Sequence, residues 1–321
     1  MEYFQRNELH IVCILDGRPG HEKQTYGIVR ALKKKVPVKV TKIEVNKPSL
    51  RSFLAELSGF YLPFGDMRGL KIVNPDIIIS TGSSTHLTAL FYKKKYRVPA
   101  VTCMAPDRLY RSRFDLCFVP VHDGYQQKGN ILTTVGPPNC STDRGLHDKN
   151  CGLVLVGGVD EKSHRWDNGD IAGKIENIVE HYPEIEWVLA SSPRTPNGMI
   201  LLLEKMSSLH SRVSFVNYKD TKPGWVEDQY DNSAIVWVTA DSVSMMFEAL
   251  TAGCKVGVIP VHWKKKINKF KTSVSFLIDN GFVLPYDCAV YKEEKWTKGE
   301  NLNEAQKCAD TILSLWWQKN L

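Results

Sequence analysis

A short segment near the start of the chain combines a carboxylate, a guanidinium and an imidazole. It reads Asp16-Gly17-Arg18-Pro19-Gly20-His21 and follows an apolar run. It has neither the Gly-Lys-Ser/Thr ending of a P-loop nor the Gly-x-Gly-x-x-Gly order of a dinucleotide-binding turn. A carboxylate and an imidazole on one loop suit general acid–base catalysis, and the glycines would allow positive φ angles and close approach of the backbone to a ligand. We therefore interpret Asp16, Arg18, Gly20 and His21 as parts of a candidate acid–base site.

A second segment, Thr239-Ala240-Asp241-Ser242-Val243-Ser244, leads directly into an expected helix. Free N–H groups at a helix N-terminus and nearby serine hydroxyls suit a pyrophosphate. Glu248 follows about one helical turn later and could accept both hydroxyls of a ribose, while Arg194, on an earlier loop, could contact the same phosphates. The alternatives are N-capping by Asp241 or Ser242 and an exposed position for Glu248. The candidate nucleotide-binding residues are Arg194, Thr239, Asp241, Ser242, Ser244 and Glu248.

Further polar residues follow other expected strands: His86, Asp107, Arg108, His122 and Asp123. His86 opens a helix and is a further catalytic candidate. His122-Asp123 could equally form a turn with an N-cap. No Asp-x-Asp triplet occurs, and no group of His, Cys and Asp has the spacing of metal ligands. We therefore expect neither a metal ion nor another cofactor.

Strand and helix patterns alternate along the chain, which favours parallel sheets with right-handed crossovers. The expected strands of the first half are His10–Leu15, Val38–Val45, Pro75–Ser80, Pro99–Met104, Leu116–Val119 and Ile131–Thr134. The pattern restarts near Cys151, after the Pro- and Gly-rich stretch Pro137–Asn150, with expected strands at Gly152–Val156, Glu186–Ala190, Val213–Val216, Ala234–Val238 and Lys255–Pro260. The sequence therefore predicts an α/β fold of two tandem Rossmann-like, doubly wound domains, 1–147 and 148–300, with a terminal helix in 301–321 packing back on the first. Ligands bind at the carboxyl ends of such strands, so we expect a cleft between the domains.

Composition is that of a globular protein: of 321 residues, 43% are hydrophobic and 24% charged, close to the soluble average. No apolar run approaches the roughly 20 residues that span a bilayer, and the N-terminus lacks the order of a signal peptide. The 8 cysteines have no zinc or redox spacing, which favours reduced thiols in a cytoplasmic protein.

The net charge of +7 is concentrated in lysine clusters that favour anionic partners, but no nucleic-acid motif accompanies them. The aromatic stretch Phe53–Phe64 predicts either a core helix with a turn or a surface that dips into a membrane interface.

Several motifs together resemble a known family, the bacterial core-oligosaccharide glycosyltransferases related to the plant mitochondrial-fission (elongated-mitochondria) protein. The matching segments are Asp16–His21 with Gln24, Ser80–His86, Phe114-Asp115 with Pro120, His122 and Asp123, Arg194-Thr195-Pro196, and Val238–Ala249. Two departures stand out. Lys222–Tyr230 replaces the family's Gly-x-Asn-Pro-Tyr segment, and Pro193 stands where the first of two adjacent arginines is usual.

The resemblance implies a GT-B glycosyltransferase, with the nucleotide-sugar donor on the C-terminal domain and the acceptor on the N-terminal one. The expected reaction is metal-independent and inverting, with a lipid-linked or lipopolysaccharide-core saccharide as acceptor at the inner face of the cytoplasmic membrane. His21 or Asp16 would be the base. Two alternatives remain open: a sugar-nucleotide epimerase of similar build, and a non-catalytic membrane-associated adaptor. Turnover of donor alone would favour the first, and absence of nucleotide binding the second.

Overall fold

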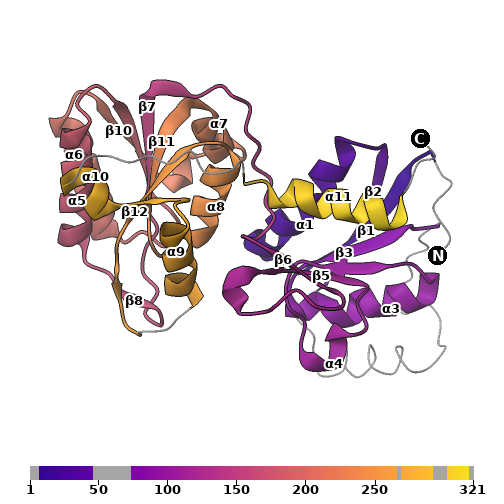
Figure 1. Cartoon of the computed structure of the whole chain (residues 1–321). Helices are drawn as coiled ribbons and strands as arrows, with labels where there is room; N and C mark the ends of the chain where they lie inside the picture. The colour runs from indigo at the N-terminus through magenta and orange to yellow at the C-terminus, as the bar shows by residue number, and fades with distance from the viewer. Residues whose placement is uncertain (1–6, 46–73, 266–268, 292–301, 318–321) are drawn as a thin grey trace. The chain divides into compact units, whose positions relative to one another are not determined.

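The computed structural model describes residues 7–45, 74–265, 269–291 and 302–317. The chain forms two compact units (Figure 1). Unit 1 comprises Met1–Cys140 with Asn303–Leu321, and unit 2 comprises Ser141–Leu302. The aromatic stretch Phe53–Phe64 and Lys266 lie outside the described residues.

Unit 1 is built on a six-stranded parallel sheet in the order β2-β1-β3-β4-β5-β6. Its strands are β1 (Leu9–Leu15), β2 (Val38–Glu44), β3 (Ile77–Ser80), β4 (Ala100–Thr102), β5 (Leu116–Pro120) and β6 (Ile131–Thr134). Its helices are α1 (Pro19–Lys33), α3 (His86–Tyr96), α4 (Arg108–Arg111) and α11 (Glu304–Trp316). The strand order reverses between β1 and β3, which is the switch point where doubly wound sheets bind ligands.

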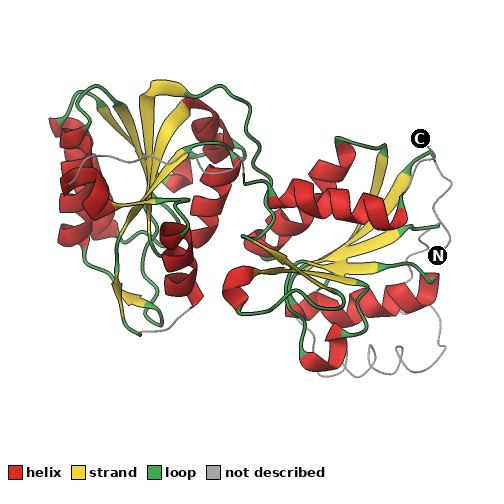
Figure 2. Ribbon diagram, viewed as in Figure 1, coloured by secondary structure: helices red, strands yellow, loops and turns green. Residues whose placement is uncertain are grey.

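The two faces of this sheet follow from the alternation of side chains along each strand. Ile11 and Cys13 of β1 share a buried cluster with Ile28 of α1 and with α11. Val12 and Ile14 point to the opposite face, in the cluster that contains Tyr92 of α3. Figure 2 shows helices on both sides of each sheet. The C-terminal helix α11 packs against α1, with Ala305, Cys308, Ala309 and Ile312 buried in the shared core.

Unit 2 has a second six-stranded parallel sheet, in the order β10-β9-β7-β11-β12-β14. Its strands are β7 (Asp148–Leu155), β9 (Glu186–Ala190), β10 (Val213–Val216), β11 (Ser233–Thr239), β12 (Lys255–Ile259) and β14 (Leu284–Pro285), and β8 (His164–Arg165) pairs antiparallel with β13 (His262–Trp263). Its helices are α5 (Asn168–His181), α6 (Asn197–Leu209), α7 (Trp225–Asn232), α8 (Val243–Thr251), α9 (Lys269–Asp279) and α10 (Tyr286–Tyr291). The order is that of a Rossmann sheet, with its switch point between β7 and β11. The predicted fold class, two tandem Rossmann-like α/β domains, is confirmed.

The structure differs from the sequence-based expectations at two boundaries. The loop after β1 ends before Pro19 and is therefore shorter than expected. Helix α1 begins at Pro19, and His21 lies in its first turn. Proline is favoured at the first helical position, where its missing N–H group is not needed. The segment 141–147 belongs to unit 2, because Arg144 forms an ion pair with Asp231 at 2.8 Å and the His147 ring hydrogen-bonds to the Tyr230 carbonyl at 3.1 Å.

Candidate functional site

At the switch point of unit 1, a histidine is held by a buried carboxylate. His21 Nδ1 lies 2.9 Å from Asp16 Oδ2, and Ser84 Oγ donates a hydrogen bond to the same oxygen at 2.8 Å. The Asp16 side chain is 2% exposed and that of His21 25%. Burial favours a higher pKa for Asp16, but the hydrogen bonds from His21, Ser84 and the Arg18 N–H outweigh it, so the pKa lies below its usual value. Asp16 is therefore ionised at neutral pH and orients the imidazole.

Gly82 allows the loop after β3 to reach this pair. It has a φ of +106°, and a Cβ atom there would lie 2.5 Å from His21 Nδ1 and 2.6 Å from Asp16 Oδ2. Only glycine combines that backbone angle with so close an approach. Gly17 has a positive φ of +74° as expected, but Gly20 is helical, so the expectation of a positive φ there is wrong. Close approach of the Gly20 backbone to a ligand stays a prediction.

His86, the third catalytic candidate, is buried at the start of α3 and 1% exposed. Its ring packs edge-on against Phe114, with centroids 5.3 Å apart, and neither ring nitrogen makes a hydrogen bond to the residues that the structure describes. Burial lowers the pKa of His86 to about 4, although Asp107 acts in the opposite direction and His21 adds to the lowering. His86 is therefore neutral at pH 7, and a role for it as a base stays a prediction.

The pKa of His86 predicts a loss of stability on acidification. Between the ordinary value of 6.5 and about 4, the unfolded chain binds a proton that the folded chain does not. The free energy of unfolding should therefore fall by about 3 kcal/mol as the pH drops through this range. Urea unfolding at pH 7 and pH 4.5 checks this against the His86→Leu variant, which should lose less stability than the unmodified chain. Equal losses in both proteins would show that another group is responsible.

The remaining candidates of unit 1 are less closely tied to the Asp16–His21 pair. The Arg18 side chain is exposed, with Nε 3.9 Å from Asp16 Oδ2, and Gln24 is half-buried on α1. Asp107 and Arg108 are exposed at the start of α4. His122 and Asp123 lie in a 3₁₀ turn after β5, with Nε2 and Oδ1 4.0 Å apart, which agrees with the turn alternative.

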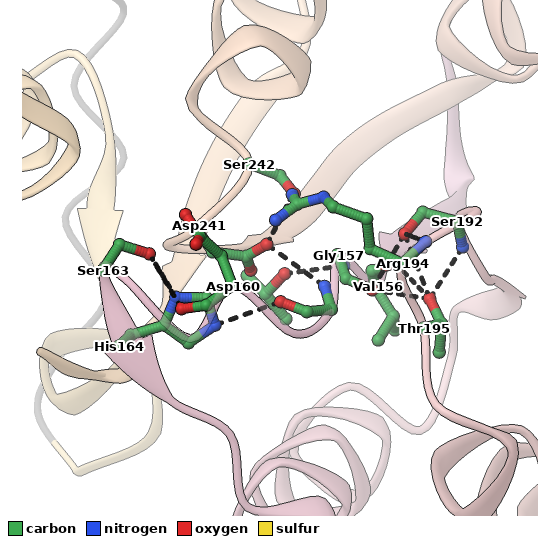
Figure 3. Close-up of polar contacts among 12 residues, drawn as sticks. Val156, Gly157, Asp160, Ser163, His164, Ser192, Arg194, Thr195, Asp241 and Ser242 are labelled. Carbon is green, nitrogen blue, oxygen red and sulfur yellow. Dashed lines mark hydrogen bonds and ion pairs between the residues drawn. The ribbon is translucent and has the colours of Figure 1, made fainter.

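In unit 2, an arginine and an aspartate are joined at the switch point between β7 and β11. Arg194 Nη2 donates to Asp241 Oδ2 at 2.7 Å and to Ser242 Oγ at 3.2 Å (Figure 3). The Asp241 side chain is 1% exposed, whereas that of Arg194 is 42% exposed. Ser242 stands at the N-cap of α8, but its side chain makes no capping hydrogen bond, a finding that does not support the N-capping alternative for this residue. The structure thus brings together three of the predicted nucleotide-binding residues.

The turn Gly157-Gly158 after β7 completes this cluster, and sequence reasoning missed it. The Gly158 N–H donates to Asp241 Oδ2 at 3.1 Å, and the Gly157 N–H donates to Thr239 Oγ1 at 2.8 Å. A Cβ atom at Gly158 would lie 1.9 Å from the Arg194 carbonyl oxygen, so no larger residue fits there. The available signal was position, because the first strand–helix turn of a Rossmann unit is where glycines allow close approach.

Side chains around the turn hold it in place from two directions (Figure 3). Ser192 Oγ donates to the Gly157 carbonyl at 2.9 Å, and Thr195 Oγ1 donates to the Val156 carbonyl, also at 2.9 Å. The buried His164 ring places Nε2 3.0 Å from the Gly158 carbonyl and Nδ1 2.8 Å from Ser163 Oγ. No spacing in the sequence marks His164, because its partner is a backbone atom of a different segment.

The other predicted nucleotide-binding residues are divided between surface and interior. Thr239 is buried and accepts the Gly157 N–H, so it supports the turn. Ser244 is exposed in the first turn of α8, and Glu248, one turn later, is 7% exposed. The alternative of an exposed Glu248 is therefore wrong, while its contact with a ribose stays a prediction.

The described ranges show neither a cluster of metal ligands nor a helix that could span a membrane. There, no three His, Cys, Asp or Glu side chains gather as a metal site would require. In the same residues no helix combines the length and the apolar character needed to cross a bilayer.

The seven cysteines whose side chains are described are free thiols, and burial raises the pKa of Cys13, Cys103, Cys117 and Cys254 to about 12.

The sequence matches one family model along nearly its whole length. The model for Mitochondrial fission ELM1 matches residues 19–316. The chain belongs to this family. The family match includes His21, Arg194 and the whole of α8, while Asp16 lies just before it. No individually curated protein matches the chain.

Solved structures of similar fold cover the chain almost completely. The UDP-GlcNAc 2-epimerase of Neisseria meningitidis bound to UDP-GlcNAc is 13% identical, with a TM-score of 0.52 over 96% of this chain and 99% of that one. A Listeria monocytogenes protein proposed to be a UDP-N-acetylglucosamine 2-epimerase is 14% identical, with a TM-score of 0.57 over 96% and 95%. The glycotransferase of kitacinnamycin is 12% identical, with a TM-score of 0.51 over 95% and 96%. This family member thus has the GT-B architecture that glycosyltransferases and UDP-GlcNAc epimerases share.

Proposed function

We propose that the chain is a glycosyltransferase that moves a sugar from a nucleotide-sugar donor to a lipid-linked or lipopolysaccharide-core saccharide. The observation that carries this proposal is the Asp16–His21 pair at the switch point of unit 1, in which a buried carboxylate orients an accessible imidazole. Such a pair is the arrangement that removes a proton from an attacking hydroxyl group. The GT-B fold supports a sugar-nucleotide substrate, and the likeness to solved structures supports the fold alone.

The geometry of the pair supports a distinct role for each ring nitrogen of His21. A carboxylate only accepts hydrogen bonds, so Nδ1 carries the proton that is donated to Asp16. In the neutral ring Nε2 then has a lone pair, which would take the proton of the acceptor hydroxyl as that oxygen attacks the anomeric carbon. The ionised Asp16 would stabilise the imidazolium that forms. Attack from the face opposite the leaving group would invert the anomeric centre, which is the stereochemical outcome we propose.

Unit 2 would hold the leaving nucleotide diphosphate. The N–H groups in the first turn of α8 and its helix dipole favour negative charge, and Arg194 adds a cation 42% exposed to solvent. These groups would stabilise the departing diphosphate electrostatically, which a metal ion does in other transferases. We retain the expectation of a metal-independent reaction as part of this proposal, with Ser244 as a phosphate contact and Glu248 as the ribose anchor.

Attachment to an anionic membrane surface would bring the enzyme to a lipid-linked acceptor. Lys33, Lys34, Lys94 and Lys264 are exposed, and such clusters attract anionic lipid headgroups by about 1 kcal/mol per residue near the surface. Part of this charge is already compensated, because Lys35 pairs with Asp310 at 2.6 Å and Lys93 with Asp115 at 2.8 Å. We therefore propose peripheral binding to the membrane with modest affinity.

The test is an assay of a panel of nucleotide sugars with and without saccharide acceptors, in which release of nucleotide and the fate of the sugar are followed. The expected result is nucleotide release that depends on an acceptor. Isomerisation of the donor without acceptor would identify an epimerase. If no nucleotide diphosphate raised the melting temperature, as binding to the folded state must, the chain would be a non-catalytic adaptor.

A further inference from the structure

The carboxylate of Asp241 already accepts hydrogen bonds from neighbouring protein groups, which does not suit direct contact with a phosphate. Its Oδ2 atom accepts hydrogen bonds from the Gly158 N–H at 3.1 Å, from Arg194 Nη2 at 2.7 Å and from Ser242 Oγ at 3.2 Å. Its other oxygen, Oδ1, is buried and bonds to none of the described residues. A buried anion placed beside a diphosphate would repel it, so direct binding of phosphate by Asp241 is unfavourable.

Arg194 is bound to this carboxylate by one nitrogen only. Both of its contacts, to Asp241 and Ser242, are made by Nη2. A guanidinium has five N–H donors, and those of Nε and Nη1 form no side-chain hydrogen bond within the described ranges. The Arg194 side chain is 42% exposed, which leaves part of it open to an anion while Nη2 is held by Asp241.

Holding the arginine in advance has an energetic consequence. Fixing a long side chain on binding carries a cost in conformational entropy, and a guanidinium that is already paired loses less freedom when a ligand arrives. Asp241 also bonds the Gly157-Gly158 turn, so it connects the loop after β7 with the start of α8 and the loop of Arg194. The carboxylate thus affects an anion in two opposed ways: it orients Arg194, which favours binding, and it repels the anion, which disfavours binding.

We propose that Asp241 is a positioning residue that holds Arg194 ready for the diphosphate of a nucleotide, rather than a residue that contacts the ligand. This inference rests on the proposed function, because it assumes that unit 2 binds a nucleotide diphosphate. It assigns to Asp241 an effect that exists only through Arg194. Without Arg194, only the repulsion between the carboxylate and the anion remains.

The experiment is a double-mutant cycle read by calorimetric binding of inorganic diphosphate, the group that nucleoside-diphosphate leaving groups share. In the otherwise unmodified chain, Asp241→Asn should weaken binding about tenfold. In the Arg194→Ala background, the same Asp241→Asn change should leave binding unchanged or tighten it, because it removes a repulsive charge. Such a dependence on the presence of Arg194 is not expected of a residue that merely supports the fold. Equal weakening in both backgrounds would show that Asp241 contacts the ligand and would overturn the inference.

A milder variant and the unmodified chain complete the design. Ser242→Ala removes one acceptor of Arg194 and one donor to Asp241, and its smaller weakening should also vanish in the Arg194→Ala background. Ser242→Ala takes the place of Asp241→Asn in the cycle if the Asp241→Asn variant does not fold. If the unmodified chain binds neither inorganic diphosphate nor a nucleotide diphosphate, both this inference and the proposed function fail. Binding with additive mutational effects removes this inference alone.

Discussion

Replacement of His21 by alanine is expected to lower the rate of sugar transfer by about 10²–10⁴-fold, the usual contribution of a general base. The variant loses the only ring that is both oriented by Asp16 and partly exposed at the unit 1 switch point of the described chain. Binding of the donor should be unchanged, because the proposed donor site lies in unit 2. Initial rates of nucleotide release at saturating donor, together with calorimetric donor binding, measure the two quantities separately.

Two further variants test the same proposed base, one as a second disruption of the pair and one as a control. Asp16→Asn keeps the shape of the side chain but removes the charge that orients the imidazole, so it should also reduce transfer severely without changing donor binding. His181→Ala removes an exposed histidine at the end of α5, far along the chain from the pair, and should have no effect. Normal transfer by both His21→Ala and Asp16→Asn would eliminate the proposed base.

The positions of the strands and the identity of several site residues could be predicted because local patterns determine them. Apolar runs such as Leu9–Leu15 are buried on both faces, and polar residues directly after them must lie at the carboxyl edge of a parallel sheet. This reasoning predicts Asp16, His21, Arg194 and Asp241 as candidates, and the structure brings Asp16 next to His21 and Arg194 next to Asp241. The first residue of α1 could also have been found, since proline favours the first helical position.

Other features depend on contacts between residues distant in sequence, which periodicity does not reveal. Ser84 and Asp16 are 68 positions apart, and Gly158 and Asp241 are 83 apart. Which residue becomes buried at such a meeting point depends on how two loops approach each other. This is why the burial of Asp241 and His86, and the supporting role of His164, were not anticipated. The short polar helix α7 has eight residues, too few to give a recognisable helical period in the sequence.

The two units share an arrangement of residues at their switch points. In both, a buried aspartate at the switch point accepts hydrogen bonds from a neighbouring loop and orients a basic side chain: His21 in unit 1 and Arg194 in unit 2. The imidazole suits proton transfer, whereas the permanently charged guanidinium suits an anion. In both, a glycine on a second strand-end loop permits the contact, Gly82 in one unit and Gly158 in the other.

Gly158→Ala is therefore expected to destabilise unit 2 by about 3 kcal/mol, near the upper end of the usual cost of overpacking. The added methyl group would meet backbone atoms of Arg194 and Thr195, at 1.9 Å and 2.5 Å, rather than a side chain that could move aside. The loop that carries Arg194 would be displaced from Asp241, so binding of inorganic diphosphate should weaken as well. Thermal unfolding and calorimetry measure the two effects.

Gly173→Ala is the matched control, because Gly173 lies inside α5 of the same unit and a Cβ atom there would meet nothing within 4 Å. Alanine is favoured over glycine in a helix interior, so this variant should be more stable by about 0.5–1 kcal/mol. The same substitution thus has opposite expected signs at two positions of one unit. A Gly158→Ala variant as stable as Gly173→Ala would mean that the turn after β7 does not pack against the Arg194 loop, and the proposed anion site would lose its structural basis.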